Sequence, residues 1–218
     1  MNSTTTLLSD PLTTTIIENK SEVKKDPFGW YYSMVPTGVY QGVVIHGKQH
    51  TEEDPSVLHF PDYIDGTPVV GIASKAFENC HFIKEIRNWP YALRFIGSQA
   101  FSGCNKLSSY LSLPSWLRCV ESEAFADCAQ LKAVELPFYL KQIGVNSFRG
   151  CSKLKYMIYT SMHPVQVMKD SSRINRPFEF PLQVGNRTIL MVPYDIYSEM
   201  NRLCNEFFFY EIRAMSGR

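Results

Sequence analysis

The sequence predicts a short right-handed solenoid of α/β repeats, with a parallel strand ladder along one side, helical turns along the other and a cap at each end. Two observations support this: a motif of about two dozen residues occurs four times in tandem, and the flanking segments have the composition of strands. The chain has 218 residues, of which 44% are hydrophobic and 20% charged, so it is long and apolar enough to bury a core.

The tandem motif is the strongest signal in the sequence. Its copies begin at Ile72, Ile96, Val120 and Ile143 and read IASKAFENCHFIKEI, IGSQAFSGCNKLSSY, VESEAFADCAQLKAV and IGVNSFRGCSKLKYM. A coil of this length buries its apolar side only by stacking on the next coil. The residues that recur at fixed positions are therefore predicted to form the repeat core. They are Phe77, Cys80, Phe101, Cys104, Phe125, Cys128, Phe148 and Cys151.

Within each copy, the small residue, the phenylalanine and the cysteine are spaced as on one face of a single α or 3₁₀ turn. Gly103 and Gly150 precede the cysteine in two copies, and Asn79 and Asp127 in the others, which predicts a positive φ at this position. The cysteines are predicted to be free thiols rather than disulfides or zinc ligands. Four of them recur in one column with parallel side chains, and none has the close pairing of a zinc site.

A ladder strand is predicted after each cysteine. The third copy has the spacing Leu131-x-x-Val134-x-Leu136, whereas the first two carry one additional residue, which fits a bulge. Residues beside the buried positions of a strand face solvent and are predicted to form the partner-binding face. These residues are Glu85, Arg87, Ser109, Leu111, Ala133, Glu135, Tyr156 and Ile158. The alternative is that they merely coat the sheet or pack against the caps.

The segments around the repeats are predicted to cover the open ends of the stack. Residues 1–26 are polar and Thr-rich, which predicts a flexible leader, and residues 27–70 are predicted to be an N-terminal β cap. The four repeats occupy residues 71–160. Residues 161–218 are predicted to be a C-terminal cap, with a strand at 188–193 followed by a helix.

The repeat pattern I-G-x-x-A-F-x-x-C-x-x-L-x-x-V-x-L-P resembles the BspA-type leucine-rich repeat, over about residues 60–160. The segment Met191-Val192-Pro193-Tyr194, with Tyr197 and Phe207, is similar to the terminal unit of that family. The departures are Glu121 in place of glycine and Ser147 in place of alanine. The resemblance implies a non-catalytic adhesion or protein-interaction module without a cofactor, at the cell surface or outside the cell.

The charge and composition of the chain argue against two classes of partner, nucleic acids and the interior of a membrane. A net charge of +1 argues against nucleic acid, and no stretch approaches the roughly 20 apolar residues that span a bilayer. The first thirty residues lack a signal-peptide pattern, so a cytoplasmic location is expected if Met1 is the native start. The resemblance implies a protein partner, such as a host or matrix protein, or a glycan, and the chain is expected to be a monomer.

Two other function classes stay open: a structural or display module without a tight ligand, and an enzyme with a site around Tyr32, His46 and His59. Binding is favoured over catalysis because no activated nucleophile or acid–base pair is visible. The segment Gly42–Lys48 imitates a phosphate-binding loop, but Gln49 stands where Ser or Thr is required, so a strand is predicted there. The histidines lack metal-ligand spacing, and neither a metal nor a cofactor is predicted.

Overall fold

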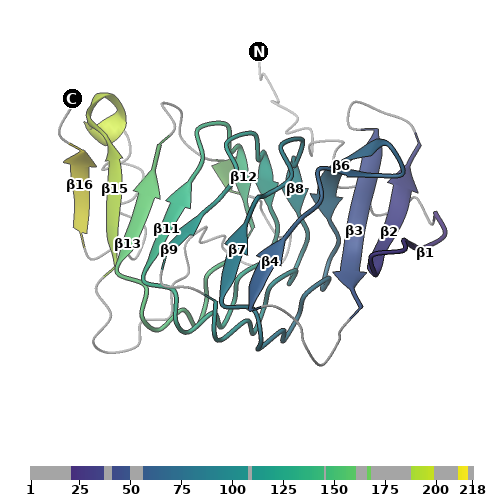
Figure 1. The fold of residues 1–218 in the computed structure, drawn as a ribbon. Coiled ribbons are helices and arrows are strands. Elements are labelled where there is room, and N and C mark those ends of the chain that lie inside the picture. Colours follow the sequence, from purple (N-terminus) through teal and green to yellow (C-terminus); the bar gives the residue numbers. More distant parts are fainter. Residues whose placement is uncertain are drawn as a thin grey trace, which may run out of the picture.

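The computed structural model shows a parallel β-solenoid whose coils lie side by side (Figure 1). It describes residues 21–36, 41–49, 56–107, 110–144, 146–160, 166–167, 188–198 and 211–215. The N-terminal strands stand at one end of the stack and the C-terminal strands at the other (Figure 1). The predicted solenoid with a parallel ladder is therefore present.

The largest sheet runs along one side of the solenoid in the order β1-β2-β3-β6-β8-β10-β12-β14, with β5 paired to β6. The pairs β1–β2, β2–β3 and β5–β6 are antiparallel, and the others are parallel. Its strands are β1 (Lys24–Lys25), β2 (Trp30–Val35), β3 (Gly42–Lys48), β5 (Tyr63–Ile64), β6 (Thr67–Ile72), β8 (Phe95–Ile96), β10 (Cys119–Val120), β12 (Gln142–Ile143) and β14 (Gln166–Val167). The strand predicted at Gly42–Lys48 is confirmed as β3.

A second, fully parallel sheet is the ladder that the repeats predicted, and we call it the ladder sheet. Its strands are β9 (Tyr110–Ser112), β11 (Ala133–Leu136), β13 (Tyr156–Tyr159), β15 (Ile189–Pro193) and β16 (Glu211–Met215). A separate parallel pair joins β4 (Val57–His59) to β7 (Glu85–Arg87). Within the described residues, β7 and β9 are not paired, so the predicted ladder is interrupted after the first copy.

The predicted helical turns are absent from the described part of the repeats, where each segment between β-strands is a series of turns. The cause is a positive φ at two positions of each copy, which no continuous helix accepts. The second of these positions is the predicted one, at Asn79, Gly103, Asp127 and Gly150. The first was not predicted; it falls at Lys75, Gln99, Glu123 and Asn146.

Backbone hydrogen bonds in these turns alternate between local bonds to the residue three positions earlier and bonds to the following coil. The N–H groups of Phe77, Phe101 and Phe125 each donate, over 2.8 Å, to a carbonyl of the following coil. The turns are therefore held both by their own local hydrogen bonds and by pairing with the next coil. A short 3₁₀ helix, η1 (Tyr194–Ile196), follows β15 at the C-terminal end.

The core confirms the predicted phenylalanine column. The rings of Phe77, Phe101, Phe125 and Phe148 are at most 3% exposed, and successive rings lie 5.3 to 5.5 Å apart at interplanar angles of 4° to 6°. Face-to-face contact at this spacing follows from identical side chains placed one coil apart. Trp30 and Phe60 extend the aromatic core beyond Phe77 toward the N-terminal strands.

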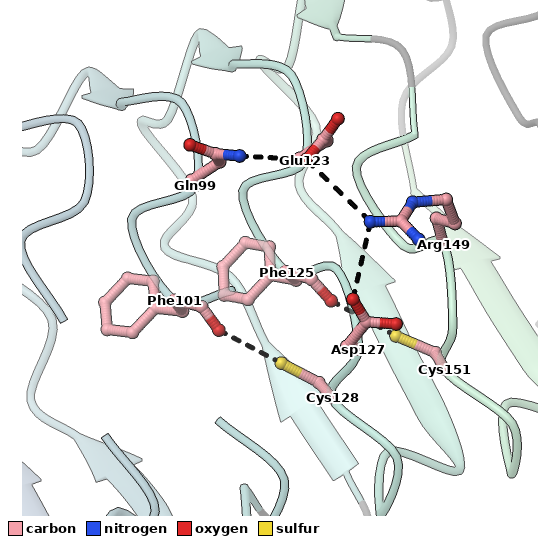
Figure 2. A network of polar contacts seen from close by, with 8 residues as sticks. All are labelled: Gln99, Phe101, Glu123, Phe125, Asp127, Cys128, Arg149 and Cys151. Carbon is pink, nitrogen blue, oxygen red and sulfur yellow. Dashed lines mark hydrogen bonds and ion pairs between the residues drawn. The ribbon is translucent and has the colours of Figure 1, made fainter. Parts of the chain in front are cut away.

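The five cysteines in the described residues are not joined in disulfide bonds, as predicted. Cys104, Cys128 and Cys151 are buried, and Cys80 is half-buried. Each of the three buried thiols donates to the carbonyl of the phenylalanine in the preceding coil, over 3.2 to 3.3 Å. Figure 2 shows two of these contacts. Cysteine therefore fills the column as a small apolar residue. Its thiol also adds a second hydrogen bond to the Phe77 and Phe101 carbonyls, which already accept a backbone N–H, and alanine cannot supply this bond.

The two departures from the repeat pattern are both buried and hydrogen-bonded. Glu121 is 6% exposed, and its carboxylate accepts hydrogen bonds from the backbone N–H and the hydroxyl of Ser98, at 2.8 and 3.0 Å. The Ser147 hydroxyl lies 2.5 Å from the Gly144 carbonyl and 3.1 Å from that of Glu121. Both side chains tie neighbouring coils together without disturbing the stack.

Candidate binding surface on the ladder sheet

The outer face of the ladder sheet consists of two columns of side chains. Strand alternation turns Leu111, Val134, Met157 and Leu190 into the core, where each is at most 3% exposed. Their neighbours on either side face outward and are aligned by the strand register. We call these residues the ladder face: Tyr110, Ala133, Tyr156 and Ile189 in one column, and Ser112, Glu135, Ile158 and Met191 in the other.

Four of the predicted partner-binding residues lie on the ladder face: Ala133, Glu135, Tyr156 and Ile158. Tyr156 is 43% exposed, and the other three are half-buried. Ser109 lies outside the described residues.

Glu85 and Arg87 lie elsewhere, on β7, which pairs with β4. Their side chains form an ion pair with each other, with Arg87 Nε 2.7 Å from Glu85 Oε1. The hydrogen bond from Arg87 lowers the pKa of the Glu85 carboxyl, and the same contact raises the pKa of Arg87.

The prediction that Leu111 faces solvent is wrong. Leu111 is 3% exposed and pairs with the buried Val134, whereas its neighbour Tyr110 is 50% exposed. The reason is the additional residue of the second copy, which lies between Leu107 and Tyr110. It moves the strand by one position, and a shift of one residue exchanges the two faces of a strand.

Sequence reasoning missed four residues of the ladder face: Tyr110, Ser112, Ile189 and Met191. Tyr110 and Ser112 were missed because the bulge was placed within the strand rather than before it. The other two lie on β15, a strand that was predicted as part of a cap. A strand was predicted at residues 188–193, but the sequence of this segment does not indicate that it pairs with the ladder sheet.

The polar groups of the ladder face gather on Glu135. The Tyr110 hydroxyl donates to Glu135 Oε2 over 2.6 Å, and the Ser112 hydroxyl lies 3.2 Å from the same oxygen. The hydrogen bond to the carboxylate raises the pKa of Tyr110 to about 12. On β13 and β15 the face is apolar, through Tyr156, Ile158 and Met191, and at the C-terminal end β16 adds Arg213 in register with Met191. The face thus combines an oriented carboxylate with aromatic and aliphatic side chains on a rigid sheet.

The residues considered for catalysis make contacts with separate partners. The Tyr32 hydroxyl donates to the Asp65 carboxylate, and His46 Nε2 lies 2.8 Å from the Ser33 hydroxyl. His59 Nδ1 lies 3.4 Å from the amide nitrogen of Asn88. Burial lowers the pKa of His46. These contacts do not link a nucleophile to a base and that base to an orienting acid, as a catalytic triad would require.

Two further features of the described residues bear on function. Among them, no three His, Cys, Asp or Glu side chains lie close enough together to hold a metal ion. None of the helices that the described residues form has the length and apolar character needed to cross a membrane.

Comparison with known families identifies the repeat. Residues 69–172 match the model of the BspA type leucine rich repeat region, in six copies. These residues are BspA-type leucine-rich repeats. The match counts two copies more than the four found in the sequence, and it begins in β6, at the edge of the repeats. The resemblance inferred from the sequence is confirmed.

Solved structures of similar fold are bacterial leucine-rich repeat proteins. The T. pallidum leucine-rich repeat protein TpLRR is 31% identical, with a TM-score of 0.55 over 66% of this chain and 64% of that one. The pneumococcal vaccine antigen PcpA is 17% identical, with a TM-score of 0.54 over 87% of this chain and 48% of PcpA, and this likeness concerns the fold alone. This chain thus spans less than two thirds of the length of either protein. No curated protein sequence matches the chain.

Proposed function

We propose that this protein is a non-catalytic interaction module and that its ladder face binds a protein partner. The observation that supports this is the set of side chains on the face. Tyr110 and Tyr156 are 50% and 43% exposed, and Ile158 and Met191 are half-exposed beside them. Exposed aromatic and aliphatic residues that lie together typically mark a binding surface.

The rigidity of the ladder sheet supports the same conclusion. Each strand is hydrogen-bonded to its neighbours from β9 to β16, and the inward side chains of β9, β11, β13 and β15 are buried. A partner therefore meets a surface that loses little conformational entropy on binding. Tyrosine adds to this, since it offers a large contact area with only two side-chain torsions.

A protein partner fits the face better than a nucleic acid, because its apolar residues surround a carboxylate, Glu135, which repels phosphate. The BspA-type repeats are consistent with this role, and adhesion at the cell surface is the more specific form of the proposal.

We also propose that residues 27–70 and 161–218 cap the stack and that residues 1–26 form a leader. The superhelix is proposed to be right-handed.

The test compares two variants of the full chain. Tyr110→Ala combined with Tyr156→Ala removes both aromatic side chains from the ladder face. Tyr31→Ala is the matched control, since Tyr31 is 38% exposed on β2, at the opposite end of the solenoid (Figure 1). Proteins captured by the immobilised chain are identified, and their dissociation constants for the three forms are measured.

We expect a genuine partner to bind the double variant more weakly by about tenfold or more and the control as tightly as the original chain. A partner that binds all three forms equally would exclude the ladder face as its site. Failure to find any saturable partner would instead favour a display module. Circular dichroism must show that both variants keep the fold.

A further inference from the structure

Two exposed tyrosines, Tyr63 and Tyr91, meet at the surface although they are 28 residues apart in the sequence. Tyr63 is 51% exposed and Tyr91 is 53% exposed, and their hydroxyl oxygens lie 2.7 Å apart, within hydrogen-bond distance. Their ring centroids are 5.7 Å apart, and the ring planes are inclined to each other by 53°. The rings are therefore close along their edges as well as at their hydroxyls, because rings that met only end to end would have more distant centroids.

The position of Tyr63 is fixed by a β-hairpin. Tyr63 lies in β5, which pairs with β6 across the turn Asp65-Gly66. Both turn residues have a positive φ, of 49° and 72°, as the tightest hairpin turns require. Ile64 is buried, so strand alternation directs Tyr63 outward. The Tyr32 hydroxyl donates to the Asp65 carboxylate and holds the turn against β2.

The position of Tyr91 is fixed by the backbone around it. Tyr91 lies between two buried residues, Pro90 and Ala92. Its N–H donates to Asp62 Oδ1 over 3.0 Å. Because Asp62 directly precedes Tyr63, this hydrogen bond ties the backbone of one tyrosine to that of the other. The two phenols are thus held together by the fold, and their own hydrogen bond adds to this.

We infer that Tyr63 and Tyr91 form a site of oxidative cross-linking, at which hydrogen peroxide and an enzyme of the haem peroxidase class join the two rings into a dityrosine. Both rings are exposed to the oxidant. They are also neighbours before the reaction begins, which favours coupling within the chain over coupling between chains. The hydrogen bond from Tyr63 raises the pKa of Tyr91, so this phenol keeps its proton at neutral pH.

The reaction forms one carbon–carbon bond. Each phenol loses its hydroxyl hydrogen as one proton and one electron, which leaves a radical shared between the oxygen and the ring carbons next to the hydroxyl-bearing carbon. One such carbon of Tyr63 bonds to one of Tyr91, and the hydrogens of these two carbons move to the two oxygens. Hydrogen peroxide accepts the two electrons and the two protons and becomes two water molecules. The linked chain is therefore lighter by two hydrogen atoms.

The cross-link fastens the β5 hairpin to the corner that follows β7. It closes a loop between residues that are 28 positions apart. A covalent link across such a loop restricts the unfolded chain, as a disulfide does, and thereby stabilises the fold. The described cysteines form no disulfide, so this link is of a different chemical kind.

The test treats the dilute full chain with a haem peroxidase and a small excess of hydrogen peroxide at neutral pH. The monomer is then isolated by size-exclusion chromatography and examined by fluorescence, intact mass and peptide mapping. We expect the blue fluorescence of dityrosine, the loss of two hydrogen atoms and one linked pair of peptides that contains Tyr63 and Tyr91. The linked monomer should unfold at a higher urea concentration than the untreated chain.

Two variants remove one hydroxyl each and keep the aromatic ring. Tyr63→Phe and Tyr91→Phe should each reduce the dityrosine fluorescence of the monomer by about tenfold or more, since no second radical is held nearby. Tyr156→Phe is the matched control. Tyr156 is 43% exposed, but Ala133 lies in register between it and Tyr110. We expect this control to be cross-linked like the original chain, and circular dichroism must show that all three variants are folded.

Four results would overturn the inference. The first is a treated, folded monomer without dityrosine. The second is dityrosine that forms only between chains, and the third is equal fluorescence from the monomers of Tyr63→Phe and the original chain. The fourth is equally rapid linking of the same two residues in concentrated urea, which would show that the folded contact is not its cause. An unchanged urea midpoint of the linked monomer would exclude the stabilising role of the link.

Discussion

The solenoid has two edges that hold their charged side chains differently. At the turn edge, formed by the turns that carry Phe101, Phe125 and Phe148, Arg149 lies 3.4 Å from Asp127 and 3.9 Å from Glu123, and Gln99 donates to Glu123 over 3.0 Å (Figure 2). At the corner edge, formed by residues 90–95, 114–119 and 137–142, the guanidinium of Arg118 lies 4.7 Å from the centroid of the Tyr139 ring. One repeat therefore builds an edge held by ion pairs between coils and an edge where an arginine lies against an aromatic ring.

Both edges depend on the column between them, so the largest expected effect comes from breaking that column. Phe125 is fully buried and stacks on Phe101 and Phe148 at 5.3 and 5.5 Å. Phe125→Ala should lower the free energy of unfolding by about 3–5 kcal/mol, through lost contacts and the cavity it leaves. Urea denaturation followed by circular dichroism measures this loss. A loss below about 1 kcal/mol would mean that the stack readily collapses around the missing ring.

A smaller effect should follow from adding one methyl group at the turn edge. Gly150 has a φ of +74°, and a Cβ there would lie 1.8 Å from Asp127 Oδ1, the carboxylate that faces Arg149. Gly66 has a similar φ of +72°, but a Cβ there would meet nothing within 4 Å. Gly66→Ala should cost about 1 kcal/mol from the backbone alone, and Gly150→Ala about 2 kcal/mol. Equal losses in thermal or urea unfolding would show that the Asp127 carboxylate moves aside freely.

The core of this fold was predictable from the sequence because it depends on identity at fixed spacing. Phe77 and Phe101 fall one repeat apart, and stacked coils must bring such residues into one column. The positive φ at Gly103 and Gly150 was predictable for a different reason, since glycine is the residue that most readily adopts it. In both cases a single residue type indicated the structure: phenylalanine at a fixed spacing indicated the column, and glycine indicated the positive φ.

The turns, the large sheet and the register of β9 were not predictable in the same way. Lys75, Gln99 and Glu123 also adopt a positive φ, and these residue types give no sign of it. The strands β8, β10 and β12 have two residues each, too few for an alternating pattern. The outward position of Tyr110 depends on where one additional residue is placed. A residue count cannot decide between a bulge before the strand and one within it.

The ladder face can be examined through the ionisation of Tyr110. Its hydrogen bond to the Glu135 carboxylate raises the pKa from 10.0 to about 12. Because the folded pKa is raised, the contact stabilises the fold fully below pH 10 and this stabilisation is lost as the pH rises through about 12. Ultraviolet titration of the phenols should detect this late transition, and Glu135→Gln should return it toward the ordinary range. The same late transition in Glu135→Gln would mean that another group holds the Tyr110 proton.

The smallest expected effect comes from Arg149, and it tests the comparison of the two edges directly. Its side chain is 45% exposed, and its carboxylate partners Glu123 and Asp127 are 31% and 52% exposed, so solvent screens both pairs. Arg149→Ala should lower the free energy of unfolding by no more than about 0.5 kcal/mol, and added salt should reduce even this. Arg118→Ala removes the same type of side chain from the corner edge, where the guanidinium lies 4.7 Å from the centroid of the Tyr139 ring, and should cost about 0.5–1 kcal/mol. Equal losses that fall alike with added salt would show that the two edges do not differ in how they hold their charged side chains.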